Sequence, residues 1–152
     1  MAGENRVISR LAGSCAHRHM DRRRLHIPWS STRPIVAWAP AMLWAGLIFV
    51  ISAQPNLTFV SDQTLDFFVR KAGHMGVFGI LALLLWRAVS RTMAWRLPSA
   101  WALALAALYA VTDELHQGFV AGRHPSAVDV GIDALGALIA LVVVGIIRAR
   151  RS

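Results

Sequence analysis

Residues 72–86 read AGHMGVFGILALLLW and contain no Asp, Glu, Lys or Arg between Lys71 and Arg87. An apolar run bounded by cations is typical of a helix that crosses a membrane. The whole composition agrees, because 56% of the 152 residues are hydrophobic and only 16% are charged, which argues against a soluble domain. The single cysteine, Cys15, excludes an intramolecular disulfide and a thiolate metal site.

Outward from this run, the chain divides into four apolar segments. They cover about residues 34–53, 67–89, 97–114 and 128–147. Each can be extended to the ~20 residues that a hydrocarbon core demands. We therefore expect an all-α membrane protein, a bundle of four transmembrane helices over residues 34–147. The first segment lacks an Ala-x-Ala cleavage site near its end, so we expect an uncleaved helix rather than a signal peptide.

The basic residues are distributed unequally between the two ends of these segments. Thirteen of the 16 Lys and Arg residues flank one side, with seven in residues 1–33, three between the second and third segments and three in residues 148–152. Because positive charge stays in the cytoplasm during insertion, we expect both termini inside a bacterial cytoplasmic membrane. Residues 1–33 are then a disordered basic arm and residues 148–152 a basic tail. Topology explains the net charge of +8, so we expect no nucleic-acid partner.

Ionisable residues gather at the opposite ends of the segments, which we call the outer ends. The uncharged runs 72–86, 97–112 and 134–147 span only ~21–24 Å as helices, less than the ~30 Å hydrocarbon core. Arginines fix their inner boundaries, so the missing length must come from the outer ends. This puts seven residues at or just below the outer membrane surface: Arg70, Lys71, His74, Asp113, Glu114, Asp129 and Asp133. Such groups are costly in a membrane, and we expect them to face inward and form interhelical salt bridges.

Small residues recur at helical spacing on three of the segments. They are Gly73, Gly76 and Gly79 on the second, Ala102, Ala106 and Ala110 on the third, and Gly136 with Ala140 on the fourth. Such stripes let the backbones of membrane helices approach closely. They predict tight packing, either within the bundle or in a homodimer.

Three motifs stand at the outer ends. They are Lys71-x-x-His74-x-x-x-Phe78, the block DELHQGFVAGR at 113–123, and the set Asp129, Asp133 and Gly136. Together with Ser52-Ala53-Gln54-Pro55 after the first segment, they resemble the VanZ-like family of small bacterial membrane proteins. The resemblance covers about residues 42–146.

The resemblance implies about four transmembrane helices with the polar motifs on the extracytoplasmic side. It also implies a role at the cell envelope, because the family is named for a protein linked to teicoplanin resistance. Carried over by position, the implied functional residues are Lys71, His74, Asp113, Glu114, His116, Gln117, Arg123 and Asp129. Asp133 stands where the family often has Asn, so a neutral amide role does not carry over. The activity of the family is not established, and any cofactor is unknown.

Two uses of these residues remain open. For binding, which we favour, Arg70, Lys71 and Arg123 hold the phosphate of a membrane lipid or lipid-linked envelope precursor. Gln117, Asp129 and Asp133 complete that substrate site. For catalysis, His74 or His116 is the general acid or base of phosphoryl or acyl transfer, oriented by Asp113 or Glu114.

A structural ion-pair network and a small transporter subunit are further alternatives. The inner halves of the last three segments carry no ionisable residue, which argues against a transport path. A divalent metal held by Asp113, His116, Asp129 and Asp133 is conceivable. Carboxylates one helical turn apart are too common to identify a metal, so none of these residues is assigned as a metal ligand.

Overall fold

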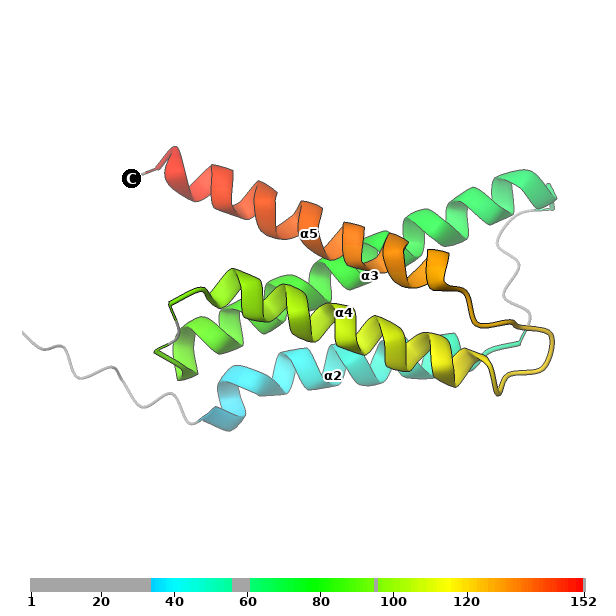
Figure 1. Ribbon diagram of the computed structural model, residues 1–152, viewed down its shortest axis with the longest axis horizontal. Helices are drawn as coiled ribbons and strands as arrows, with labels where there is room; N and C mark the ends of the chain where they lie inside the picture. The colour runs from blue at the N-terminus through cyan, green and yellow to red at the C-terminus, as the bar shows by residue number, and fades with distance from the viewer. Residues whose placement is uncertain (1–33, 56–60, 95, 152) are drawn as a thin grey trace, which may run out of the picture. The chain divides into compact units, whose positions relative to one another are not determined.

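The computed structural model describes residues 34–55, 61–94 and 96–151. Within these ranges the chain forms four α-helices and no strand. The helices are α2 (Pro34–Ser52), α3 (Gln63–Thr92), α4 (Pro98–Gln117) and α5 (Ala127–Ala149), and all belong to one compact unit, residues 31–152 (Figure 1). The prediction of an all-α fold is confirmed. The predicted basic arm, residues 1–33, lies outside the described residues.

Local sequence explains where α3 and α4 begin. The Asp62 side chain caps α3 by accepting a hydrogen bond from the Leu65 backbone N–H at 2.8 Å. This cap adds about a turn to the apolar segment that hydropathy predicts to begin near residue 67. Pro98 occupies the first turn of α4, where its missing N–H costs no helical hydrogen bond.

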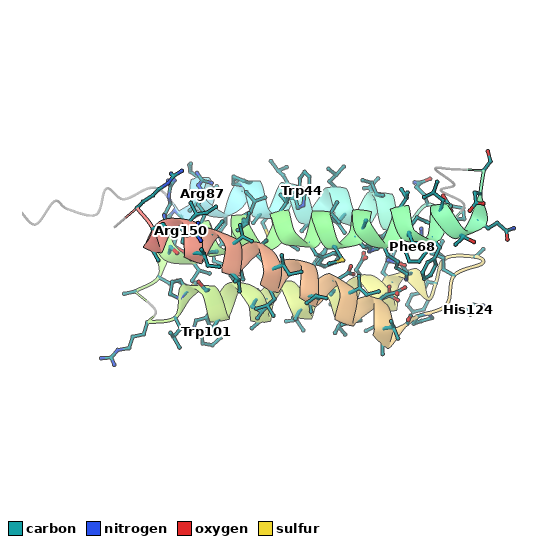
Figure 2. The ribbon with its side chains drawn as sticks, turned by 90° about the horizontal axis from the view of Figure 1, so that it is seen from above. Trp44, Phe68, Arg87, Trp101, His124 and Arg150 are labelled. Atoms are coloured by element: carbon teal, nitrogen blue, oxygen red, sulfur yellow. The ribbon has the colours of Figure 1, made fainter. Side chains whose placement is uncertain are left out.

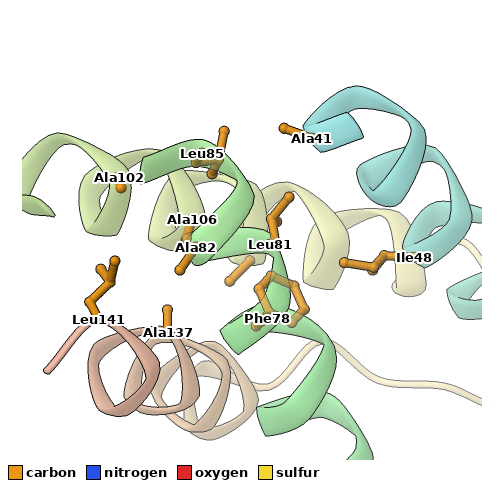
Figure 3. Close-up of a cluster of buried hydrophobic side chains, with 11 residues drawn as sticks. Ala41, Ile48, Phe78, Leu81, Ala82, Leu85, Ala102, Ala106, Ala137 and Leu141 are labelled. Atoms are coloured by element: carbon orange, nitrogen blue, oxygen red, sulfur yellow. The ribbon is translucent and has the colours of Figure 1, made fainter. Parts of the chain in front are cut away.

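The core forms around α3, which packs against α2, α4 and α5, whereas α2 touches α4 only slightly. Figure 3 shows Phe78 of α3 and Ala137 of α5 among the buried side chains. The alanine stripe predicted on α4 is fully buried at Ala102, Ala106 and Ala110. Because alanine has so little bulk, such a stripe allows neighbouring backbones to approach closely.

At Gly136 of α5 the backbones of α3 and α5 lie close together. A Cβ added there would collide with the backbone of Met75, and a Cβ at Gly79 would lie 3.3 Å from the Cβ of Ala140. The predicted small-residue packing is therefore confirmed at this crossing. Within the bundle, Gly73 and Gly76 are not packed in this way, because an added Cβ would meet no atom within 4 Å, and their packing in a homodimer stays a prediction.

Large apolar side chains face outward on the helices. Leu43 of α2 is 75% exposed and Val142 of α5 is 48% exposed. Among the described residues, α2, α3 and α5 are each long and apolar enough to cross a membrane, and α4 is not in that group. Outward apolar faces of this length suit a lipid environment, so the chain has the character of a membrane protein. The fourth span stays a prediction.

Three aromatic side chains form hydrogen bonds that link α2 to its neighbours, two of them near the middle of this helix. Trp44 Nε1 donates to the Val77 carbonyl oxygen of α3 at 2.9 Å. The Tyr109 hydroxyl of α4 donates to the Ala45 carbonyl oxygen at 2.6 Å. Inside a membrane, burial of apolar surface does not drive helices to associate. Hydrogen bonds of this kind help to join them instead.

Candidate functional site

The two ends of the described bundle differ in their charges. We call the end with the C-termini of α2 and α4 and the N-termini of α3 and α5 the polar end, and the opposite end the arginine end. Figure 2 shows Phe68 and His124 near the polar end, and Arg87 and Arg150 near the arginine end. The described carboxylates all belong to the polar end: Asp62, Asp66, Asp113, Glu114, Asp129 and Asp133.

Asp113 is the centre of a hydrogen-bonded chain that joins α2, α4 and the loop after α4. Its Oδ2 accepts bonds from Ser52 Oγ at 2.9 Å and from Gln117 Nε2 at 2.8 Å. Gln117 Oε1 in turn accepts a bond from Arg123 Nη1 at 2.9 Å. Asp113 is only 2% exposed, and these donors offset part of the cost of burying its carboxylate.

Glu114 attaches the same loop to the start of α5. Its Oε2 accepts a hydrogen bond from the backbone N–H of Ser126 at 2.8 Å, one residue before α5 begins. Within the loop, Gly122 has φ 80°, in the left-handed region that favours glycine. The turn and the Glu114 contact together hold Arg123 at the polar end.

Charged residues of α3 and α5 pair across the helix crossing. Lys71 Nζ forms an ion pair with Asp129 Oδ1. One turn further along, His74 Nδ1 lies 3.3 Å from Asp133 Oδ1, without hydrogen-bond geometry. Interhelical pairing is therefore observed, as the charge distribution predicts. Arg70 differs, because its guanidinium pairs with Asp66 of its own helix at 2.7 Å.

Several buried polar atoms of this end have no hydrogen-bond partner. They are Asp113 Oδ1, Glu114 Oε1, both carboxylate oxygens of Asp133, His74 Nδ1 and His116 Nε2. The His116 ring stacks on Phe49 of α2, with the ring centroids 4.0 Å apart. Unpaired buried polar atoms are costly, so this cluster would be stabilised by protons or by donors from a bound molecule. Within the described residues, no group of three or more His, Cys, Asp and Glu side chains is arranged to hold a metal ion.

A groove of about 330 Å³ lies between α2 and α3 next to these residues. Its apolar lining is Trp44, Leu47, Ile48, Ile51, Val69 and Val77, with Gly73. Its polar lining is Ser52, Arg70, His74 and Arg123. No carboxylate of the described residues lines this groove. Its arginines are Arg123 and Arg70, and Arg70 is paired with Asp66 of its own helix.

The predicted site residues separate into three groups. Those that line the groove are Arg70, His74 and Arg123. Those that pair across α3 and α5 are Lys71, Asp129 and Asp133. Those that support the loop or the neighbouring helices are Asp113, Glu114, His116 and Gln117.

Sequence reasoning missed two participants, Ser52 and Asp66. Ser52 donates a hydrogen bond to Asp113. Its place in the motif Ser52-Ala53-Gln54-Pro55 is the one sequence feature that could have indicated a role at this site. Asp66 precedes Arg70 by four residues, the spacing of neighbours on one helix face.

A known protein family matches most of the chain. The sequence model of the VanZ/LLP1 family matches residues 16–148. No curated protein and no solved structure matches the chain. The family match spans well over half of the sequence and includes all four described helices except the end of α5. The chain therefore belongs to the VanZ/LLP1 family, as its motifs indicate.

Proposed function

We propose that this protein binds an amphiphile with an anionic head, a membrane lipid or a lipid-linked envelope precursor, in the groove between α2 and α3. The observation that carries this proposal is the lining, which combines an apolar wall with Arg70, His74 and Arg123. Arginine binds phosphate through two parallel charge-assisted hydrogen bonds. The volume of about 330 Å³ is near the lower limit of ligand pockets, ~300–1,000 Å³, and suits a headgroup with the first part of its chain.

The direction of the groove supports an amphiphilic ligand. Trp44 and Ser52 both line it and are eight residues apart on α2, so it follows the helix for ~12 Å. Leu47 and Ile51 in its wall are 46% and 45% exposed, which leaves the groove open to lipid from the side. A hydrocarbon chain fits this wall while the head stays near the arginines.

The hydrogen-bonded chain from Asp113 prepares Arg123 for a ligand. Gln117 accepts from one guanidinium nitrogen of Arg123, and the guanidinium has five N–H donors in all. Donors therefore remain for an anionic head. In this proposal Asp113 and Gln117 are positioning residues, and Arg123 contacts the ligand.

The proposal includes a topology with α4 as a fourth span and both termini in the cytoplasm. It is supported by the excess of Lys and Arg at the arginine end and in residues 1–33. The groove then opens to the outer leaflet, where its occupancy would contribute to protection against the glycopeptide teicoplanin. Reporter fusions in residues 118–126 should report an extracytoplasmic position and fusions in residues 93–97 a cytoplasmic one. The reverse result would overturn this topology.

Filling the groove tests ligand binding directly. Gly73 lines it, and a Cβ there would meet no atom within 4 Å, so Gly73→Leu occupies the space without a backbone clash. Gly46→Leu is the matched control, because Gly46 lies on α2 outside the groove and its Cβ also meets nothing within 4 Å. We expect mass spectrometry to detect a co-purifying anionic lipid with the wild type and with Gly46→Leu. Gly73→Leu and Arg123→Gln should lose it, and equal lipid content in all four proteins would contradict the proposal.

The unpaired buried groups favour a second candidate, an enzyme that acts on the same lipid. His116 Nε2 and Glu114 Oε1 have no partner, and acid–base catalysis needs groups that are free to exchange a proton. In this candidate His74 or His116 moves the proton during phosphoryl or acyl transfer. An altered envelope lipid that appears on expression of the wild type, but not of His74→Ala, would favour the enzyme over the binding protein.

A purely structural ion-pair network makes a different prediction. If His74→Ala and Glu114→Ala proteins insert normally and protect a sensitive bacterial host from teicoplanin as well as the wild type does, neither the binding site nor the enzyme is supported. Loss of protection at normal protein levels would instead support a functional site at the polar end.

A further inference from the structure

A second pocket, separate from the groove, lies at the arginine end between α3 and α5. Its volume is about 480 Å³, and its polar lining is Trp86, Arg87, Ser90 and Arg91 of α3 with Arg148 of α5. It shares no lining residue with the groove between α2 and α3. The proposed ligand site uses none of these residues, so the pocket needs its own explanation.

The three arginines of this pocket have no carboxylate partner within the described residues. Every described ion pair belongs to the polar end, as do all the described Asp and Glu side chains. Membrane insertion accounts for arginines at this end, but it does not require Arg87, Arg91 and Arg148 to converge on one cavity. Convergent like charges repel one another unless an anion lies between them.

Two features distinguish the arginine pocket from a set of unattached cations, although Arg91 and Arg148 are themselves exposed. The Arg148 guanidinium packs over the Trp86 ring, 4.2 Å from its centroid, which holds this cation against the bundle. The Ser90 hydroxyl in the wall is buried and has no hydrogen-bond partner. An anion in the pocket would supply an acceptor for Ser90 and for three guanidinium groups.

The remaining lining identifies the class of anion. Leu83, Leu84 and Val144 form an apolar wall on the side of the pocket toward the middle of the bundle. A free phosphate gains nothing from that wall, whereas the acyl chain of a lipid does. Basic pockets between transmembrane helices bind phospholipid headgroups in this way. We propose that the arginine pocket binds the phosphodiester headgroup of an anionic phospholipid from the adjacent leaflet.

Native mass spectrometry of the full chain in zwitterionic detergent tests this site. We expect phosphatidylglycerol to bind, and phosphatidylcholine with the same acyl chains to bind at least about tenfold more weakly. Arg87→Gln/Arg91→Gln/Arg148→Gln should weaken phosphatidylglycerol binding by a similar factor. The matched control is Arg96→Gln/Arg150→Gln/Arg151→Gln, which removes equal charge from exposed positions outside the pocket and should bind as the wild type does.

A second variant keeps the charge, and with it the signal for membrane insertion. Arg87→Lys/Arg91→Lys/Arg148→Lys retains three cations but loses the planar guanidinium forks, so we expect weaker binding than in the wild type. Binding equal to the wild type would overturn recognition by the pocket and leave charge attraction alone. Equal losses in the two glutamine triples would overturn it as well. Inorganic phosphate that competes as well as phosphatidylglycerol would overturn the lipid assignment in favour of a free anion.

Discussion

The polar end and the arginine end of this bundle accommodate charge in opposite ways. At the polar end, Lys71 pairs with Asp129, and Asp113 accepts hydrogen bonds from two other side chains. At the arginine end, Arg87 and Arg148 meet no carboxylate of the described residues. Charges that are paired within the chain become part of the fold, whereas like charges without a partner depend on water or on a ligand. Substitutions of the paired residues at the polar end should therefore change stability, whereas substitutions of the unpaired arginines at the arginine end should leave stability nearly unchanged and change binding.

The crossing of α3 and α5 between these two ends carries the largest expected effect. Gly136→Ala would drive a Cβ into the backbone of Met75, which cannot give way as the end of a flexible side chain can. We expect a loss of about 3 kcal/mol in the free energy of unfolding, the upper range of overpacked cores, and a lower thermal midpoint in detergent.

Gly131→Ala on the same helix is the control, because its Cβ would meet no atom within 4 Å. Equal midpoints for the two variants would mean that α3 and α5 are not in tight contact. The pairing of Lys71 with Asp129 would then lack the close crossing that brings the two helices together.

Asp113→Leu gives the next largest effect, and it compares the two ends directly. The substitution leaves Ser52 Oγ and Gln117 Nε2 buried without their shared acceptor, which should cost about 2 kcal/mol. Arg91→Leu at the arginine end breaks no described ion pair, so we expect a change within about 0.5 kcal/mol. Thermal unfolding of both proteins in one detergent measures the difference. Equal losses would remove the distinction between the ends.

A double-mutant cycle on Lys71 and Asp129 tests whether their pairing belongs to the fold. Lys71→Glu and Asp129→Lys should each lower the unfolding midpoint, and the exchanged pair should recover it with a coupling of about 1 kcal/mol. Neither residue lines the groove between α2 and α3, so the exchanged protein should also keep the co-purifying lipid. Recovery of stability without recovery of the lipid would assign Lys71 to the ligand.

The fold was largely predictable because membrane helices depend on long apolar segments. The first predicted segment, 34–53, nearly coincides with α2 at Pro34–Ser52. The start of α3 was predicted less well, since hydropathy detects the apolar run but not the polar turn that Asp62 caps. Hydropathy also indicated a span over residues 97–114, whereas α4 is not among the helices apolar enough to cross a membrane unaided.

The site was predictable where residue spacing or opposite charge indicated a contact. The spacing of Asp113 and Gln117 anticipates their hydrogen bond, because residues four apart share one helix face. The bond from Ser52 to Asp113 joins α2 to α4 and depends on how both helices are rotated, which spacing alone does not determine. The charge distribution indicated interhelical pairs but not that Arg70 would pair within α3, although Asp66 stands four residues before it.

The smallest expected effect concerns a neutral hydrogen bond near the arginine end. Trp38 Nε1 of α2 donates to Thr92 Oγ1 of α3 at 3.1 Å, and that hydroxyl donates to the Ala88 carbonyl oxygen at 2.8 Å. Thr92→Val removes the acceptor but keeps the side-chain shape. We expect a loss of about 0.6 kcal/mol, the average for side-chain hydrogen bonds between membrane helices, measured as a shift in the thermal midpoint.

Thr112→Val is the matched control, because the Thr112 hydroxyl donates only within α4, to the Tyr109 carbonyl oxygen. It should leave the midpoint nearly unchanged, so the difference between the two variants isolates the contact of α2 with α3. A loss at Thr92 as large as the loss at Asp113 would mean that one neutral bond near the arginine end joins the helices as strongly as the buried carboxylate at the polar end. The two ends would then differ in their charges but not in how they hold the bundle together.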